Sequence, residues 1–145
     1  MTSYDYIFNE FKDKITDPDL LLLSNDLQTE VLVALLSKAI SRCNRVCSNT
    51  VDLSLRDDII LEFSVDIPDD VVDIITEWMI VFWLKPYLNN TENLWNTLST
   101  KDFSMFSPAN LLEKISDRYE RAWVHARGLT NEYSFAIADM TRLKS

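Results

Sequence analysis

Glycine is nearly absent from this sequence of 145 residues, in which Gly128 is the single example. Loops that hold phosphate groups need glycines so that the backbone can approach the ligand closely. A Walker loop, a dinucleotide-binding fingerprint and a nucleophile elbow each contain more than one glycine, so none of them can be written in this chain. The composition therefore excludes most nucleotide-dependent enzyme classes.

Histidine and cysteine are also scarce, with His125 the only histidine and Cys43 and Cys47 the only cysteines. Three such residues cannot complete a four-ligand zinc site from one chain. The cysteines stand four residues apart and share one face of a helix, so we predict two buried thiols. His125 has no nucleophile or orienting partner visible in the sequence. We therefore expect no metal site and no cofactor.

Converging carboxylates are missing as well. The adjacent acids Asp57 and Asp58, and likewise Asp69 and Asp70, point to different faces of a helix or strand. Such neighbours cannot share a proton as a catalytic pair does. We therefore expect no catalytic residues and no enzymatic activity.

Basic residues are too few for a surface that neutralises phosphates. The chain has 14 Lys and Arg against 23 Asp and Glu, and a net charge of −9. Residues 1–77 contain sixteen acidic and six basic residues, whereas residues 78–145 contain seven acidic and eight basic residues. Nucleic-acid binding through phosphates requires a cationic face, so this mode is excluded. The acidic half either meets a basic partner or is simply solvated.

Long apolar runs are lacking too. The most apolar stretch, residues 71–84, is interrupted by Asp73, Thr76 and Glu77 and is too short and too polar to cross a bilayer. A helix over this stretch would be apolar on nearly all sides, so it is the central helix of a bundle, meets a neighbouring subunit, or does both. Large aromatic side chains are enriched at interface hot spots. The candidates for a subunit interface are Trp78, Phe82 and Trp95.

Apolar residues three and four apart predict helices over most of the chain, at residues 4–15, about 25–47, 66–84, 91–98 and 107–128. Pro86 is expected to end or kink the third of these helices. Gly128 stands where a helix takes a left-handed terminating residue. The sequence therefore predicts a mainly α protein, a compact bundle of about four to five helices.

Residues 51–65 have a different pattern. Val51, Leu53 and Leu55 alternate with polar residues, as do residues 61, 63 and 65. Alternation is typical of strands and predicts a small hairpin with its turn at residues 56–58. An ordered loop over the helices is the other interpretation.

The segment after Gly128 also alternates. We expect residues 1–128 to form the helical bundle domain and residues 129–145 to form an extended C-terminal tail. Such a segment can add as a strand to the sheet edge of a partner, and the alternative is that it folds back on its own domain. The predicted partner-binding residues are Tyr133, Phe135, Ile137, Met140 and Arg142.

Three short segments carry a resemblance to a known family: WLKP at residues 83–86, TENL at 91–94 and KDFSMFSPANL at 101–111. In this order they resemble small virion proteins of tailed bacteriophages, specifically the head–tail connector proteins, also called neck or adaptor proteins. The resemblance covers the C-terminal half of the chain.

The resemblance implies a structural virion protein that joins the capsid to the tail in the neck of the virion, after assembly in the host cytoplasm. Its implied partners are further copies of itself in a twelvefold ring that matches the portal, the portal protein itself, and a downstream neck or tail-completion protein. DNA would pass through the ring without specific binding, and a negatively charged lumen would repel its phosphates. No membrane partner is implied.

Two other functions are compatible with the same composition. One is an acidic phage-encoded inhibitor that mimics DNA or blocks a host protein. The other is an unrelated regulatory helical-bundle module.

Overall fold

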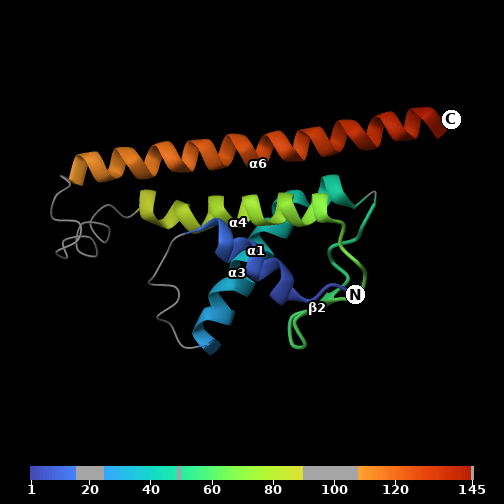
Figure 1. Cartoon of the computed structure of the whole chain (residues 1–145), viewed down its shortest axis with the longest axis horizontal. Coiled ribbons are helices and arrows are strands. Elements are labelled where there is room, and N and C mark those ends of the chain that lie inside the picture. Colours follow the sequence, from blue (N-terminus) through green and yellow to red (C-terminus); the bar gives the residue numbers. More distant parts are fainter. Residues whose placement is uncertain (16–24, 49, 90–107, 145) are drawn as a thin grey trace.

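The computed structural model describes residues 1–15, 25–48, 50–89 and 108–144, and at residues 25, 87–89, 108–112, 114 and 139–144 it describes the backbone alone. The described residues form four helices and a two-stranded antiparallel sheet (Figure 1). The elements are α1 (Tyr4–Lys14), α3 (Asn25–Cys47), β1 (Arg56–Asp57), β2 (Glu62–Phe63), α4 (Asp69–Asn89) and α6 (Pro108–Lys144). The prediction of a mainly helical bundle with a small hairpin is confirmed.

Helix α4 is the centre of the bundle. It contacts α1, α3 and α6, and α6 lies along it in the opposite direction (Figure 1). Val71, Ile75 and Met79 of α4 are completely buried. None of the helices in the described residues has the length and apolar character needed to cross a membrane.

Helix α1 follows the apolar stripe expected from the sequence. The Ser3 hydroxyl caps its start by accepting a hydrogen bond from the backbone N–H of Asp5 at 3.2 Å. Tyr4, Ile7 and Phe11 are buried, as predicted from their spacing. This face packs against α4.

Helix α3 ends at Cys47, close to the predicted boundary. Cys43 and Cys47 are both free thiols and both completely buried, which confirms the prediction of buried cysteines. A hydrogen bond with the Cys47 sulfur, together with burial, raises the pKa of the Cys43 thiol. Cys43 is thus held in its neutral form inside the core.

The hairpin is present, although its turn is not where the sequence placed it. Arg56 pairs with Phe63 and Asp57 with Glu62, so the turn begins at Asp58 and not at Arg56. The sheet has two residues in each strand, and Val51, Leu53 and Leu55 lie outside it. Their alternation arises because Val51 and Leu53 turn into the core from an irregular segment.

The N-terminal segment is attached to the hairpin by backbone hydrogen bonds. Phe63 N–H donates to the Thr2 carbonyl at 2.8 Å, and Tyr4 N–H donates to the Leu61 carbonyl at 2.9 Å. Ser3 and Glu62 form an isolated antiparallel bridge. The start of the chain therefore extends the small sheet beneath α1.

The predicted end of the last helix at Gly128 is wrong, because α6 continues through Gly128 to Lys144. The non-helical conformation predicted for residues 129–145 is therefore also wrong over residues 129–144, which are the ones that the structure describes. Tyr133 and Ile137 are one helical turn apart and share a face, whereas Phe135 lies between them in sequence and opposite to them on the helix. An alternation over so few residues is compatible with either period.

Pro86 does not end α4, which continues to Asn89. A proline inside a helix removes one backbone hydrogen bond, and the packing of α4 against its neighbours offsets that loss. The short helix predicted for residues 91–98 lies outside the described residues.

Candidate protein-interaction surfaces

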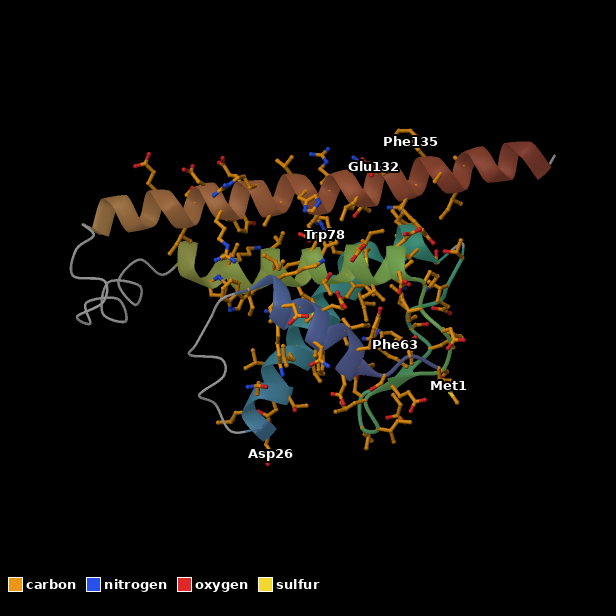
Figure 2. All side chains as sticks on the ribbon, viewed as in Figure 1. Met1, Asp26, Phe63, Trp78, Glu132 and Phe135 are labelled. Carbon is orange, nitrogen blue, oxygen red and sulfur yellow. The ribbon has the colours of Figure 1, made fainter. Side chains whose placement is uncertain are left out.

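The residues predicted to bind a partner are divided between the two faces of α6. The Tyr133 hydroxyl forms a hydrogen bond with Thr50 Oγ1, and Ile137 is half-buried. Phe135 is 71% exposed, and Figure 2 shows it on the side of α6 that faces away from the bundle. Met140 and Arg142 belong to the last turns of α6, where the backbone alone is described. The described residues of this set thus leave Phe135 as the one open to a partner.

Two of the three candidate residues for a subunit interface, Trp78 and Phe82, are buried or half-buried within the chain. Trp78 is 4% exposed and lies between α4 and α6 (Figure 2), where its ring centroid is 6.5 Å from that of the half-buried Phe82. Trp95 lies outside the described residues. Trp78 therefore offers almost no surface to another subunit in the folded chain.

Arginine side chains cover the tryptophans on one flank of α6. The guanidinium carbon of Arg42 lies 5.1 Å from the ring centroid of Trp78 and 5.9 Å from that of Trp123. Arg127 lies 5.3 Å from the Trp123 ring, and the two tryptophan rings meet edge to face at 5.9 Å. The cation–π contacts of Arg42 attach α6 to α3 and α4, and that of Arg127 lies within α6.

Arg118 makes a further contact of the same kind, with the ring of Trp83. Arg118 is half-buried, and its guanidinium carbon lies 5.3 Å from the ring centroid of Trp83. Phe11 of α1 meets the same Trp83 ring at 6.5 Å. The Trp83 side chain therefore connects α1, α4 and α6.

A polar network also joins α1, α4 and α6. Lys14 Nζ lies 3.1 Å from Glu77 Oε1 and donates to Thr76 Oγ1 at 2.8 Å. His125 Nδ1 lies 3.2 Å from Glu77 Oε2. This partner of His125 could not be predicted from the sequence, because Lys14, Glu77 and His125 come together through the fold alone. The network can act as a polar tie between α1, α4 and α6.

A small cavity of about 260 Å³ lies beside this network, between α4 and α6. It is smaller than the pockets that usually hold small-molecule ligands. In the described part of the chain, no three metal-ligating side chains gather as a metal site would require. The cavity is lined by Asp70, Asp73, Ile74, Leu129, Glu132, Tyr133 and Ala136.

The turn of the hairpin presents two isoleucines to solvent, and we call Ile59 and Ile60 the hairpin tip. Ile59 is 91% exposed and Ile60 is 66% exposed. The Asp57 carboxylate accepts hydrogen bonds from both of their backbone N–H groups, at 2.8 and 3.2 Å. Leu61, which follows, has a φ of 58°, a left-handed conformation that leucine rarely adopts. The alternating pattern of residues 51–65 predicts strands and not this tip, because the tip lies in the turn between the strands.

The base of the turn is held by a second set of contacts. The Tyr4 hydroxyl donates to Asp58 Oδ1 at 2.6 Å, and Arg56 Nε lies 3.5 Å from the same oxygen. Burial and the hydrogen bond to Asp58 raise the pKa of Tyr4 well above its usual range. These contacts therefore hold the base of the hairpin tip in an ordered conformation.

The outer face of α6 also carries exposed apolar side chains. Val124 is 68% exposed and lies on the same side of the helix as Phe135. Gly128 lies between them, and a β-carbon added there would have no neighbour within 4 Å among the residues that the structure describes. We call Val124, Gly128, Asn131 and Phe135 the Gly128 patch, an uncharged strip along this face.

Comparison with known proteins found no protein-family model, no curated protein and no solved structure that matches this chain. The resemblance to phage connector proteins therefore stays a hypothesis that depends on the sequence segments alone.

Proposed function

We propose that this chain is a structural subunit that acts by packing against other proteins, as a head–tail connector in the neck of a tailed-phage virion. The observation that carries the proposal is the exposure of apolar side chains on two separate sides of the bundle. The hairpin tip lies on the side away from α6, and Phe135 lies on the outer side of α6 (Figures 1 and 2). A ring subunit needs two different contact surfaces of this kind, because each copy meets one neighbour on either side.

The acidic residues support a place around a DNA channel. Asp66, Asp69, Asp70 and Asp73, at and just before the start of α4, are all exposed. Carboxylates that face a channel repel phosphate and keep DNA from binding to the wall. In the proposed ring this side of the bundle faces the lumen, and DNA passes without specific binding.

The C-terminal part of α6 is the segment proposed to dock on the portal. Beyond Phe135 the helix continues for more than two further turns to Lys144, and these turns carry Met140 and Arg142. A helix can dock on a partner by placing its apolar side chains in a hydrophobic groove. The remaining partner in this proposal is the downstream neck or tail-completion protein.

The direct test is assembly on a portal. The purified chain is mixed with a portal protein from the same genome, and the products are measured by native mass spectrometry and electron microscopy. A ring of this chain attached to the portal is the expected result. A chain that neither binds the portal nor enters particles would contradict the proposal.

A second function is favoured by the same acidic side. Exposed carboxylates at Asp57, Asp58, Asp66, Asp69 and Asp70 form the kind of surface that could replace DNA on a host protein. An acidic inhibitor would act as a monomer and would reduce the activity of a DNA-binding enzyme. Inhibition without any assembly on the portal would favour this function over the connector.

A further inference from the structure

Gly128 lowers the stability of α6, and nothing in the described residues compensates for this cost. A glycine in a helix interior is less favourable than alanine, since it loses more conformational freedom on folding. A glycine is required where the backbone takes a positive φ or where another group approaches closely. Gly128 has no positive φ, and no group in the described part of the chain approaches it closely. The free space over Gly128 is therefore open to a group from another molecule.

The hairpin tip has the complementary shape. Its two isoleucines project from a turn whose backbone is held by Asp57, and Leu61 adopts its left-handed φ beside them. Strained backbone of this kind persists only where the surrounding contacts hold it, and it is concentrated at functional positions. The tip is therefore ordered before it meets a partner, which lowers the entropic cost of binding.

The tip and the Gly128 patch cannot meet within one chain. The hairpin lies at one side of the bundle, and α6 lies at the other, with α1, α3 and α4 between them (Figure 1). A contact between these two surfaces must join separate copies. Such a contact is head-to-tail, which leaves one free tip and one free patch in every pair and so continues into a ring or a filament.

Charge favours the same arrangement. The tip stands among Asp57, Asp58 and Glu62, in the half of the chain that carries sixteen acidic against six basic residues. The outer side of α6 near Gly128 carries Arg121 and Arg127 together with Glu120 and Glu132, all exposed, so its charges balance. Two acidic sides placed against each other in a two-fold dimer would repel, whereas the head-to-tail contact places the acidic tip on the less acidic side.

We propose that the hairpin tip of one copy seats over Gly128, between Val124 and Phe135, on helix α6 of the next copy. This inference rests on the proposed function, because it names the contact between neighbouring subunits of the assembly. The contact is small, so a single pair binds weakly and the assembly gains strength when a ring closes or when the portal gathers the copies.

The test uses two variants that each remove one side of the contact. Ile59→Ser with Ile60→Ser removes the apolar tip and leaves the patch intact. Gly128→Gln fills the patch with a polar side chain of good helix propensity and leaves the tip intact. Leu27→Ser, which changes an exposed apolar residue on α3, is the control for the tip, and Ser134→Gln, at an exposed position on α6, is the control for the patch.

Sedimentation velocity at increasing concentration measures assembly. The unaltered chain and both controls are expected to form species larger than a dimer, and each of the two variants is expected to stay monomeric. Mixed in equal amounts, the two variants should form a 1:1 heterodimer and nothing larger, because a single intact tip meets a single intact patch. Urea unfolding shows that each variant is folded, and Gly128→Gln should unfold at a higher midpoint than the unaltered chain.

The outcomes separate this inference from the proposed function. Assembly of either variant like the unaltered chain, or a failure of the mixture to give heterodimers, would overturn the contact. A ring of the tip variant on the portal would overturn the contact and leave the connector function standing. Absence of any ring of the unaltered chain on the portal is the failure of the connector function itself.

Discussion

Trp78 of α4 donates a hydrogen bond from its indole Nε1 to Oγ1 of Thr130 on α6, at 2.9 Å and out of contact with solvent. Thr130 Oγ1 donates in turn to the Ala126 carbonyl at 2.8 Å. The threonine hydroxyl thus satisfies the indole N–H in the apolar layer between the two helices. Thr130 follows Gly128 in the sequence, so the second half of α6 belongs to the packed structure of the chain.

Replacing Thr130 with valine tests this hydrogen bond. Thr130→Val keeps the shape of the side chain and leaves the buried indole N–H of Trp78 without its acceptor, so we expect a loss of about 1–3 kcal/mol in the free energy of unfolding. Thr130→Ser keeps the hydroxyl and should lose less. Urea denaturation followed by tryptophan fluorescence measures both. Equal stabilities of the valine and serine variants would contradict the role of the hydroxyl.

Glu77 is expected to contribute more through Lys14 than through His125. The Lys14 side chain is 26% exposed and that of His125 is 61% exposed, so solvent screens the histidine contact more strongly. Double-mutant cycles with Glu77→Gln should give a coupling energy below about 1 kcal/mol for His125→Gln and a larger one for Lys14→Met. Glu113→Gln, at an exposed carboxylate of α6, is the control. The reverse order of the two couplings would contradict the burial argument.

Gly128→Ala distinguishes a continuous helix from a helix that ends at this residue. In a continuous α6 the alanine should stabilise the chain by about 0.5–1 kcal/mol, because glycine is the less favourable helix residue. In a left-handed terminating position the same change would destabilise it by about 1 kcal/mol. The sign of the change in thermal or urea unfolding decides between them.

Tyr4 makes the stability of the chain depend on alkaline pH. Its pKa is raised in the folded state by burial and by the hydrogen bond to Asp58, so the folded state favours the protonated hydroxyl. This contribution is complete below the unfolded value of 10.0 and is lost as the pH rises above it. Tyr4→Phe should be less stable at neutral pH by about 1 kcal/mol and should lose less stability between pH 9 and 11. Tyr119→Phe is the control, and an unchanged pH dependence in Tyr4→Phe would contradict the assignment.

Truncation tests whether the end of α6 can be separated from the bundle. A chain that ends at Gly128 loses Thr130 and Tyr133, which contact Trp78 and Thr50, and should unfold at a lower urea concentration. A chain that ends at Ala138 retains both contacts and should keep most of its stability. Circular dichroism during urea titration measures both chains. Equal stability of the two truncated chains would contradict a packing role for Thr130 and Tyr133.

The helices were predictable because their apolar spacing extends over several turns. Ile7, Phe8 and Phe11 in α1, or Leu32, Leu36 and Ile40 in α3, repeat often enough to specify the period and the buried face. Cys43 and Cys47 followed from the same face of α3. Burial could thus be inferred wherever the pattern was long.

The conformations near Gly128 and Pro86 could not be predicted from local preferences. Gly128 resembles a helix terminator, yet Trp78, Thr50 and Ile74 lie where the following residues can pack, and this tertiary packing overrides the preference. The sequence around Pro86 gave no information on the neighbours that hold α4 together.

The interaction surfaces were even less accessible from the sequence. The tie between Lys14, Glu77 and His125 joins residues from three helices, and their spacing along the chain contains no sign of it. Phe135 was identified as a partner-binding candidate from an alternation that proved to be helical. The hairpin tip could have been predicted from the two adjacent isoleucines after Asp57 and Asp58. Exposure to solvent is unfavourable for two large apolar side chains in an acidic turn, so their presence there indicates a contact surface.

The position of α6 has a consequence for the order of synthesis. Helices α1, α3 and α4 leave the ribosome first, so the side of α4 that carries Trp78 and Ile74 is exposed until α6 has been translated. An apolar helix face that is exposed before α6 has been translated is a site for chaperone binding or for aggregation between nascent chains. The arginines that contact the tryptophans are also separated in the order of translation. Arg42 precedes Trp78, whereas Arg118 and Arg127 follow it.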